Sequence, residues 1–200
     1  MKMPRLLHYF AHPGLNSSRI NSEMFERARA VEGVTHIDLY AEFPRYHINI
    51  DGEQQRLLDH DILLLQFPFF WYSCPALVKE WIDLVLEHGF AYGEGGDKLK
   101  DKTMMLALTT GGPQDAYQPE GYQHFHLRTF LTPFEQTARL CQMHFLAPYV
   151  LHGALSATPD DHAAGFVRLI EALRDGTLDT EAATTADILT HDTLPLSYGA

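Results

Sequence analysis

The sequence predicts an α/β fold in which a five-stranded parallel sheet is doubly wound, with helices on both faces. Five short apolar segments alternate with stretches of helical periodicity, and the connections between them are short. The clearest segment, Ile62 to Phe67, is an almost wholly apolar run of the kind found in strands covered on both faces. A chain of 200 residues suits one domain with a single core.

The first half of the chain predicts three of the strands. Arg5 to Ala11 reads as a short apolar strand, and a polar loop then leads into a helix whose apolar residues recur at helical spacing. Gly33 is expected to end that helix. The other elements expected here are a strand over 34–40, a short polar helix over 51–59 and the strand 62–67.

The second half predicts two strands and three helices. Pro75 stands where a helix can begin, because proline fits the first turn. Two further helix starts are indicated by a capping-box pattern at Thr132, Pro133 and Glu135 and by a similar signal at Thr158, Pro159 and Asp161. The expected elements are a helix from 75 toward 88, a strand over 103–110, a helix over 132–142, a strand over 145–155 and a helix over 158–175.

The end of the chain differs in composition from the rest. Residues 177–200 are rich in Thr, Ala and Asp and have weak periodicity. We therefore expect a domain over 1–176 that holds the ligand, followed by a loosely attached C-terminal tail over 177–200.

Charge and hydropathy narrow the class of partner. With 26 acidic and 15 basic residues the net charge is -11, which argues against nucleic acid or an anionic membrane surface and favours a small-molecule ligand. No apolar run approaches the ~18 to 20 residues that a membrane span needs, and the start MKMPRLLHYFAHPG lacks the features of a signal peptide. A cytoplasmic protein is expected.

Neither a disulfide framework nor a metal site is expected. The two cysteines, Cys74 and Cys141, have no CxxC spacing, which is typical of a reducing compartment. The close histidine pairs 8/12 and 124/126 have neither an HExxH helix nor a cysteine partner at ligand spacing.

Three loops should meet at the carboxyl edge of the sheet, where ligands of open parallel sheets bind. After the first strand, Ser17, Ser18 and Asn21 open a helix whose N-terminal amides favour an anion such as phosphate, although a serine there could be only an N-cap. After the fourth strand, the TTGG turn (109–112) is either an ordinary turn or a place where backbone amides approach a flat ring.

The third loop carries an unusual run of aromatic residues. Phe69, Phe70, Trp71 and Tyr72 follow the third strand, and each ring could bury about 150 to 250 Å². These rings could simply pack beneath the next helix. Combined with a phosphate cradle and a glycine turn at the same edge, however, they describe a site for a flavin nucleotide.

Several long motifs support this hypothesis. AHPGLNSSRIN near the start, QFPFFWYSCPALVKEWID, the following GFAYG, LTTGG with Tyr117 behind it, and the region from Phe134 to Gly153 cover most of residues 5–175. In these stretches the chain resembles the flavodoxin-like NAD(P)H:quinone oxidoreductases, and among them the ancillary proteins of glutathione-regulated potassium efflux systems.

The resemblance implies a homodimer that holds flavin at the subunit interface, and it assigns residue roles. It implies contacts to the flavin phosphate and ribityl chain from His12, Ser18, Arg19, Ile20 and Asn21. It implies that Phe69, Phe70, Trp71 and Tyr72 line one side of the isoalloxazine ring, that Thr109, Thr110, Gly111 and Gly112 meet its edge, that Tyr117 lies near its pyrimidine end, and that Tyr92 reaches into the active site of the neighbouring subunit.

Two positions depart from the family pattern. Some relatives carry a histidine six residues after the equivalent of Tyr117, where this chain has Gln123, with His124 one place later. His124 is therefore a candidate proton donor, beside Tyr117 and the amides of Gly111 and Gly112 as stabilisers of negative charge. A second family tyrosine corresponds to Glu94, which predicts a pocket of different polarity.

The resemblance implies a two-step reaction, in which NAD(P)H reduces the flavin and the flavin then reduces a quinone or a similar electrophile. FMN is the expected cofactor and FAD the alternative, because the larger quinone reductases of the family use FAD. Two other functions stay open at this point. One is a regulatory subunit with little turnover that binds a membrane potassium antiporter at the inner face of the cell membrane, and the other is an azoreductase or nitroreductase role.

Overall fold

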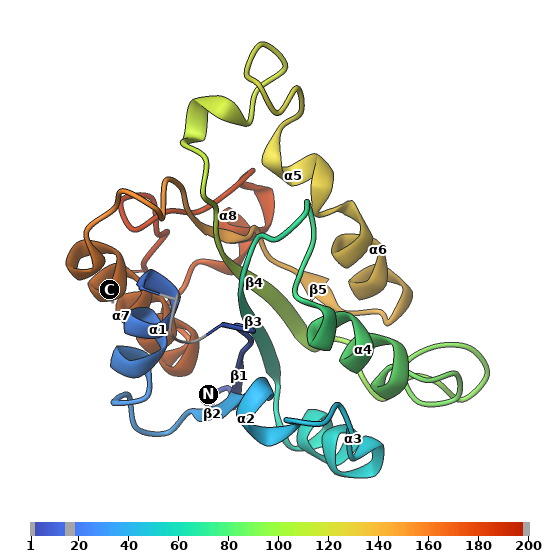
Figure 1. Cartoon of the computed structure of the whole chain (residues 1–200). Coiled ribbons are helices and arrows are strands. Elements are labelled where there is room, and N and C mark those ends of the chain that lie inside the picture. Colours follow the sequence, from blue (N-terminus) through green and yellow to red (C-terminus); the bar gives the residue numbers. More distant parts are fainter. Residues whose placement is uncertain (1–2, 15–18, 198–200) are drawn as a thin grey trace.

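A computed structural model describes residues 3–14 and 19–197 of the chain. Its strands form one parallel sheet in the order β2-β1-β3-β4-β5, with β6 also paired to β4 (Figure 1). The strands are β1 (Leu6–Phe10), β2 (Thr35–Asp38), β3 (Ile62–Pro68), β4 (Thr103–Thr109), β5 (His144–Phe145) and β6 (Tyr149–Leu151). This is the strand order of flavodoxin-like sheets, and the predicted fold class is confirmed.

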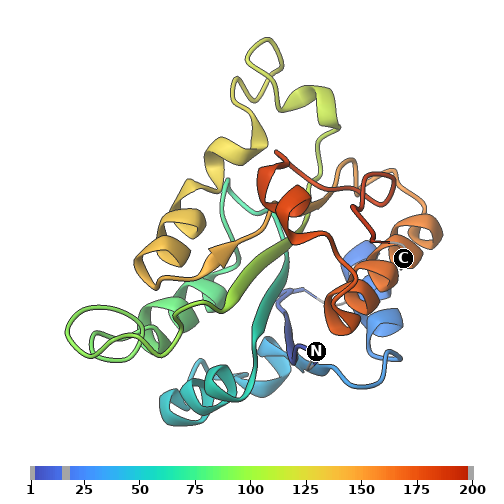
Figure 2. The same cartoon turned by 180° about the vertical axis from the view of Figure 1, so that it is seen from behind.

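Helices lie on both faces of the sheet (Figures 1 and 2). They are α1 (Ile20–Ala28), α2 (Leu39–Glu42), α3 (Ile50–Asp59), α4 (Ala76–Val85), α5 (Leu127–Phe130), α6 (Thr132–Leu140), α7 (Pro159–Asp175) and α8 (Thr180–Thr185). Helices α1 and α7 pack together on one face, whereas α3, α4 and α6 lie on the other.

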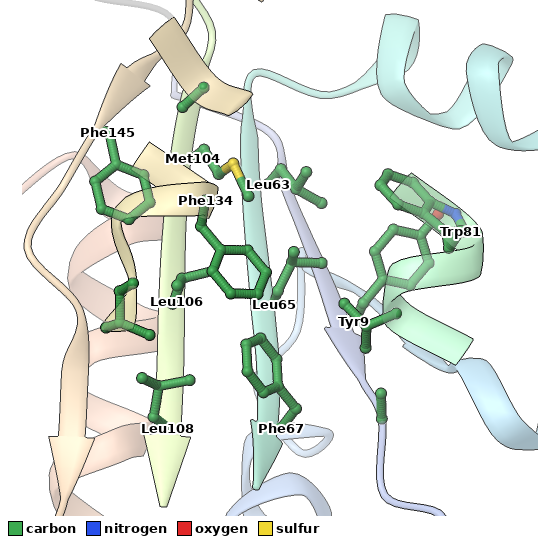
Figure 3. Packing of buried hydrophobic residues seen from close by; sticks show 14 of the residues in the cluster. Tyr9, Leu63, Leu65, Phe67, Trp81, Met104, Leu106, Leu108, Phe134 and Phe145 are labelled. Carbon is green, nitrogen blue, oxygen red and sulfur yellow. The ribbon is translucent and has the colours of Figure 1, made fainter. Parts of the chain in front are cut away.

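Alternation along the central strands divides the core between the two faces. Leu63, Leu65 and Phe67 of β3 point to the same side as Trp81 of α4 and Phe134 of α6 (Figure 3). The intervening positions of β1, β3 and β4 face α1 and α7, and they include the buried polar residues His8, Gln66 and Thr109. The polar floor of the site described below therefore lies under α1.

The predicted fifth strand over 145–155 is interrupted and shorter. β5 pairs with the start of β4 and β6 with its end, so the two pieces lie along the same edge of β4. Pro148 stands between them, and proline cannot donate a ladder hydrogen bond. β6 ends at Leu151, and Gly153 follows with φ +68, a left-handed value that favours glycine.

The two predicted helix starts occur at the expected places but without the expected caps. α6 begins at Thr132 with Pro133 in its first turn, yet the Thr132 hydroxyl donates to the carbonyl of Thr129 and not to its own helix. Glu135 forms ion pairs with Arg128 and Arg139, so the capping box is absent. These arginines offer the carboxylate charged donors, which form stronger hydrogen bonds than a backbone amide does.

The segment over 177–197 is packed, contrary to the loosely attached tail that we expected. Leu178, Ala183 and Leu189 are buried in the core cluster beneath α7. The Val150 N–H donates to the carbonyl of Leu189 at 2.8 Å, which extends the sheet beside β6. Asp179 caps α8 by accepting from the amide of Ala182.

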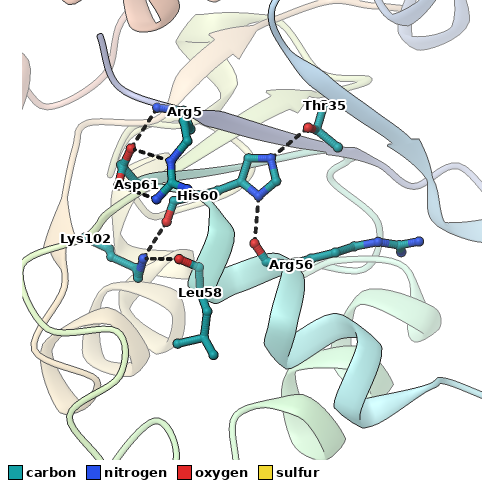
Figure 4. A network of polar contacts seen from close by, with 7 residues as sticks. All are labelled: Arg5, Thr35, Arg56, Leu58, His60, Asp61 and Lys102. Carbon is teal, nitrogen blue, oxygen red and sulfur yellow. Dashed lines mark hydrogen bonds and ion pairs between the residues drawn. The ribbon is translucent and has the colours of Figure 1, made fainter. Parts of the chain in front are cut away.

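A network of polar side-chain contacts closes the amino edge of the sheet (Figure 4). Arg5 pairs with Asp61 at 3.2 Å, and Lys102 donates to the carbonyl of His60. His60 Nδ1 lies 2.7 Å from the Arg56 carbonyl, and its Nε2 lies 2.7 Å from the Thr35 hydroxyl. Because a carbonyl only accepts, the neutral ring carries its proton on Nδ1. The functional site lies at the opposite edge.

Within the part of the chain that the structure describes, no helix is long and apolar enough to cross a membrane.

Candidate functional site

A pocket of about 570 Å³ opens at the carboxyl edge of the sheet, where the chain leaves β1, β3 and β4. This is the size of a pocket that holds a cofactor or a drug-sized molecule. Its walls come from three loops predicted to meet here and from a fourth loop after β6. The lining residues are His12, Arg19, Ile20, Asn21, Pro68, Phe69, Phe70, Thr109, Gly111, Ala154 and Leu155.

One end of the pocket suits an anion. Arg19 is the N-cap residue of α1, so the positive end of the helix dipole and the guanidinium lie at the same end of the pocket. The guanidinium is exposed and donates to the carbonyl of Ala157 at 3.2 Å, which ties it to the loop after β6. A phosphate group placed here would meet both a helix dipole and a cation.

His12 provides a neutral hydrogen-bond donor in the pocket wall. Its Nδ1 accepts from the amide of Gly14 at 3.1 Å, so the proton of the neutral ring lies on Nε2. Burial lowers the pKa of His12, which keeps the ring neutral near pH 7. The ring meets Phe70 edge-on, with centroids 5.7 Å apart.

The aromatic run after β3 forms a tight turn. The amide of Ser73 donates to the carbonyl of Phe70, and both residues between them, Trp71 and Tyr72, have positive φ (48° and 64°). Such values cost bulky side chains of the order of 1 to 3 kcal/mol each. The turn leaves Trp71 93% exposed and Phe70 42% exposed, while Phe69 is buried. Most of the aromatic platform thus faces the pocket mouth or solvent and does not pack beneath α4.

The loops after β4 and β6 are joined by backbone hydrogen bonds. The amide of Ala154 donates to the Thr110 carbonyl, and the amide of Gly153 donates to the Gly112 carbonyl. Gly111 lines the pocket, and a Cβ built on it would come no closer than 3.5 Å to Leu155. A methyl group at this position would therefore sit in ordinary van der Waals contact with Leu155, and the Gly111 backbone borders the pocket without a side chain.

A buried polar chain forms the floor of the pocket. Asn21 Nδ2 donates to the Thr109 hydroxyl, and Gln66 Nε2 donates to the Asn21 side-chain oxygen at 3.1 Å. Gln66 Oε1 lies 3.0 Å from His8 Nε2, and His8 Nδ1 lies 2.9 Å from Nδ1 of His36. His8, Gln66, Asn21 and Thr109 are at most 5% exposed.

His8 makes stability depend on pH. Burial, and then the neighbouring His36, lowers the pKa of His8 to about 3, whereas an unfolded histidine has a pKa of about 6.5. Between these two pKa values the unfolded chain binds more protons than the folded chain does. The contribution of His8 to the unfolding free energy is therefore fully present above about pH 6.5 and decreases as the pH falls. We expect His8→Gln to make the dependence of the unfolding free energy on pH shallower by about 1.4 kcal/mol per pH unit. Urea unfolding from pH 6 to pH 4 measures it, and equal slopes in wild type and variant would contradict it.

The structure brings most of the sequence-predicted binding residues into the pocket. His12, Arg19, Ile20, Asn21, Phe69, Phe70, Thr109 and Gly111 line it. The predicted Ser18 lies outside the residues that the structure describes. Trp71, Tyr72, Thr110, Gly112, Tyr117, Tyr92 and His124 are not among the lining residues.

These seven residues lie outside the pocket in different surroundings. Tyr72 stacks on Phe130, with ring centroids 5.1 Å apart, and Tyr92 lies beside His88 in the 88–96 loop. Thr110 is fully buried, and its hydroxyl donates to the carbonyl of Gly112. Their predicted roles with a ligand remain predictions.

The two candidates for proton handling are unequally placed. Tyr117 is 5% exposed and packs against Phe69, and burial raises the pKa of its phenol, which therefore stays protonated. His124 is exposed and has φ +61. The histidine that packs against Tyr117 is His152, whose Nδ1 lies 3.2 Å from the Thr110 hydroxyl and which no sequence motif indicated.

The loop over 152–157 was missed because the fifth strand was predicted to run to Leu155. It contributes Ala154 and Leu155 to the pocket, and Pro68 is the other lining residue that was not predicted. Gly153 was the available signal, because a glycine after a buried strand commonly marks the turn at its end.

Comparison with known proteins now identifies the family. A model of the flavodoxin-like fold family matches residues 4–175. The chain belongs to this family. It is 43% identical over 157 residues to the glutathione-regulated potassium-efflux system ancillary protein KefG of Pectobacterium carotovorum, covering 78% of this chain and 86% of the relative.

Solved structures of similar fold carry related descriptions. The general stress protein 14 of Treponema denticola, in complex with FMN, has a TM-score of 0.80 and 31% identity and covers 85% of this chain and 99% of its own. An NADPH-quinone reductase from P. pentosaceus has a TM-score of 0.74 and 28% identity, and the match covers 85% of this chain and 97% of that one. The predicted family and the similarity to the potassium efflux ancillary proteins are confirmed.

Proposed function

We propose that the chain binds FMN in the pocket at the carboxyl edge of the sheet and uses it as an NAD(P)H:quinone oxidoreductase. The observation that carries the proposal is the joint placement of an anion-binding helix start, exposed aromatic rings and an open glycine turn around one pocket. The FMN complex of the Treponema protein supports FMN over FAD as the cofactor.

The donors around the pocket fit a flavin mononucleotide. Arg19 and the first turn of α1 suit the phosphate, and His12 and Asn21 offer polar contacts between that end and the rings. Phe69 and Phe70 provide an aromatic wall for a flat ring system, and the lack of a side chain at Gly111 would let the backbone approach the edge of that ring.

When bound, FMN would supply the redox chemistry, accepting a hydride from NAD(P)H and passing two electrons to the acceptor. The protein's share is positioning and charge stabilisation. The protonated phenol of Tyr117 and the backbone amides of Gly111 and Gly112 would stabilise negative charge at the pyrimidine edge. The second proton that a hydroquinone needs would come from solvent or from an exposed group such as His124.

The same proposal includes a homodimer with the site at its interface. Exposed aromatic side chains cluster in sequence around the pocket loops, namely Phe70, Trp71, Tyr72, Tyr122 and Phe125. Rings left this exposed in a monomer are typical of interaction sites. Tyr92 would then serve the partner's site, and sedimentation equilibrium of the FMN-loaded protein tests the assembly.

The similarity to KefG favours a second candidate function. In this alternative the chain is a regulatory subunit of a potassium efflux antiporter, and FMN has a structural or sensing role with little turnover. An azoreductase or nitroreductase role shares the first half-reaction and differs only in the acceptor.

Titration with FMN and with FAD, followed by NADPH and NADH oxidation with and without a quinone, tests the function. We expect Gly111→Ala to weaken FMN binding by about tenfold or more, because overpacking costs about 1 to 3 kcal/mol. Its unfolding midpoint should stay unchanged, since the new methyl group meets Leu155 only at 3.5 Å.

The outcomes separate the candidates. FMN binding with quinone-dependent turnover supports the reductase, and FMN binding without turnover supports the regulatory subunit. If wild type binds no flavin, or if Gly111→Ala binds FMN as wild type does, the placement of the flavin in this pocket is wrong.

A further inference from the structure

The structure assigns to His8 a positioning role: acting through Gln66 and Asn21, it fixes the Thr109 hydroxyl as a hydrogen-bond donor into the pocket. The inference deepens the proposed function, because the ligand that would accept this hydrogen bond is the flavin. His8 itself lies on β1, on the face of the sheet that α1 covers, and it does not line the pocket.

The direction of each hydrogen bond follows from one unambiguous acceptor. Gln66 Nε2 donates to the backbone carbonyl of Asn21 at 2.9 Å, and a carbonyl cannot donate. This bond shows which way the Gln66 amide faces, and the His8 contact to its oxygen holds it in that orientation. Its nitrogen faces Asn21 and its oxygen faces His8.

The orientation then propagates toward the pocket. Since the second hydrogen of Gln66 Nε2 is donated to the Asn21 side chain, the atom that receives it is the oxygen of Asn21. The nitrogen of Asn21 therefore points to the Thr109 hydroxyl and donates to it. The Thr109 oxygen accepts, so its own hydrogen is available to an acceptor in the pocket that Thr109 lines.

The orientation also propagates to the other end of the chain of bonds. Because the Gln66 oxygen only accepts, His8 Nε2 must carry the proton. The neutral ring then has an unprotonated Nδ1, which accepts from Nδ1 of His36. His36 donates from this atom whether its ring is neutral or charged, so titration of His36 does not reverse the chain.

Burial makes this arrangement hold. His8 is fully buried with its ring edge-on to Phe25 and Phe166, at centroid distances of 5.6 and 5.4 Å, and its low pKa keeps it neutral. Without the His8 donor, the Gln66 oxygen would be buried and unpaired, and a flipped amide would set its oxygen against the Asn21 carbonyl and Asn21 Oδ1, which now accept from its nitrogen. A ligand with hydrogen-bond acceptors at this position, such as the ring nitrogens and carbonyl oxygens of oxidised flavin, would then bind less tightly.

The first test uses the ligand-free protein and nitrogen-15 NMR of the histidine rings. We expect His8 to be protonated on Nε2 and not on Nδ1, and His36 to be protonated on Nδ1. A spectrum showing His8 protonated on Nδ1 would overturn the inference, whether or not the protein binds a flavin.

The second test is a double-mutant cycle with FMN affinity as the readout. Thr109→Val replaces the hydroxyl, which also accepts from Asn21, by a methyl group and should weaken FMN binding by about two- to tenfold, as expected for one hydrogen bond. His8→Leu should weaken it to a similar extent, but not further in the Thr109→Val background. His8→Gln, whose amide can reach the Nε2 position, should restore the affinity.

The cycle also separates this inference from the proposed function. If wild type binds FMN and the effects of His8→Leu and Thr109→Val simply add, His8 does not act through Thr109 and the inference fails. If wild type binds no FMN, the proposed function fails, and the histidine tautomers then decide the polarity of the chain. Unfolding curves of each variant exclude a loss of affinity through misfolding.

Discussion

Truncation of the chain after Gly176 is expected to prevent stable folding, although the weak periodicity of residues 177–200 is typical of a tail that is not needed for folding. Leu178 and Leu189 are 6% and 2% exposed, and Ala183 is fully buried. The removed segment also supplies the acceptors for the amides of Ala147 and Val150 beside β6. The loss of several buried side chains and sheet hydrogen bonds is comparable with the ~5 to 15 kcal/mol by which a domain is stable.

A single substitution in the same segment measures this contribution without deleting it. We expect Leu189→Ala to lower the unfolding free energy by about 2 to 5 kcal/mol, since it creates a cavity in a closed core. The matched control is Leu140→Ala at the end of α6, where the leucine is 54% exposed, and its effect should stay within about 0.5 kcal/mol. Urea unfolding measures both, and equal effects of the two substitutions would contradict the packing described for Leu189.

The sequence predicts the sheet well because the central strands are buried on both faces. Continuous apolar runs such as Ile62–Phe67 can be recognised without knowledge of any partner, and the loops that follow them must meet at one edge. Eight of the binding residues expected from motifs and resemblance line the pocket for this reason. The long-range features were the ones that could not be predicted.

The missed features depend on partners that are distant in the sequence. Glu135 pairs with Arg128 and Arg139, and no local sequence pattern predicts that these ion pairs form in place of a capping box. Residues 177–197 lack periodicity of their own because only single side chains, such as that of Leu189, reach the core. Gln66 is the polar residue within an apolar run, and its partner Asn21 lies 45 residues away in the sequence.

Glu53→Ala is expected to have the largest effect of any single substitution outside the apolar core. The Glu53 carboxylate is 1% exposed and accepts from the hydroxyl of Tyr9 and from Trp81 Nε1, the latter at 2.7 Å. It also pairs with Arg56. Burial and the neighbouring Glu53 raise the pKa of Tyr9, so this hydroxyl stays protonated and needs an acceptor.

The expected loss of unfolding free energy for Glu53→Ala is about 3 to 5 kcal/mol, because two buried donors lose their acceptor. Glu42→Ala is the matched control. Glu42 pairs with the same Arg56, but its side chain is 38% exposed, and exposed ion pairs contribute about 0 to 1 kcal/mol. Thermal or urea unfolding of both variants measures the difference, and a loss as small as that of Glu42→Ala would refute the buried role.

The loss should arise from the orphaned donors and not from the missing charge, and a second substitution distinguishes the two causes. In the Glu53→Ala background, Tyr9→Phe removes one of the donors that lack an acceptor, so it should recover part of the stability. In wild type, Tyr9→Phe instead deletes a satisfied hydrogen bond and should destabilise by about 1 kcal/mol. Opposite signs in the two backgrounds are expected only if the carboxylate is kept in the core as an acceptor for Tyr9 and Trp81. The same sign in both would mean that the ion pair with Arg56 is what stabilises the fold.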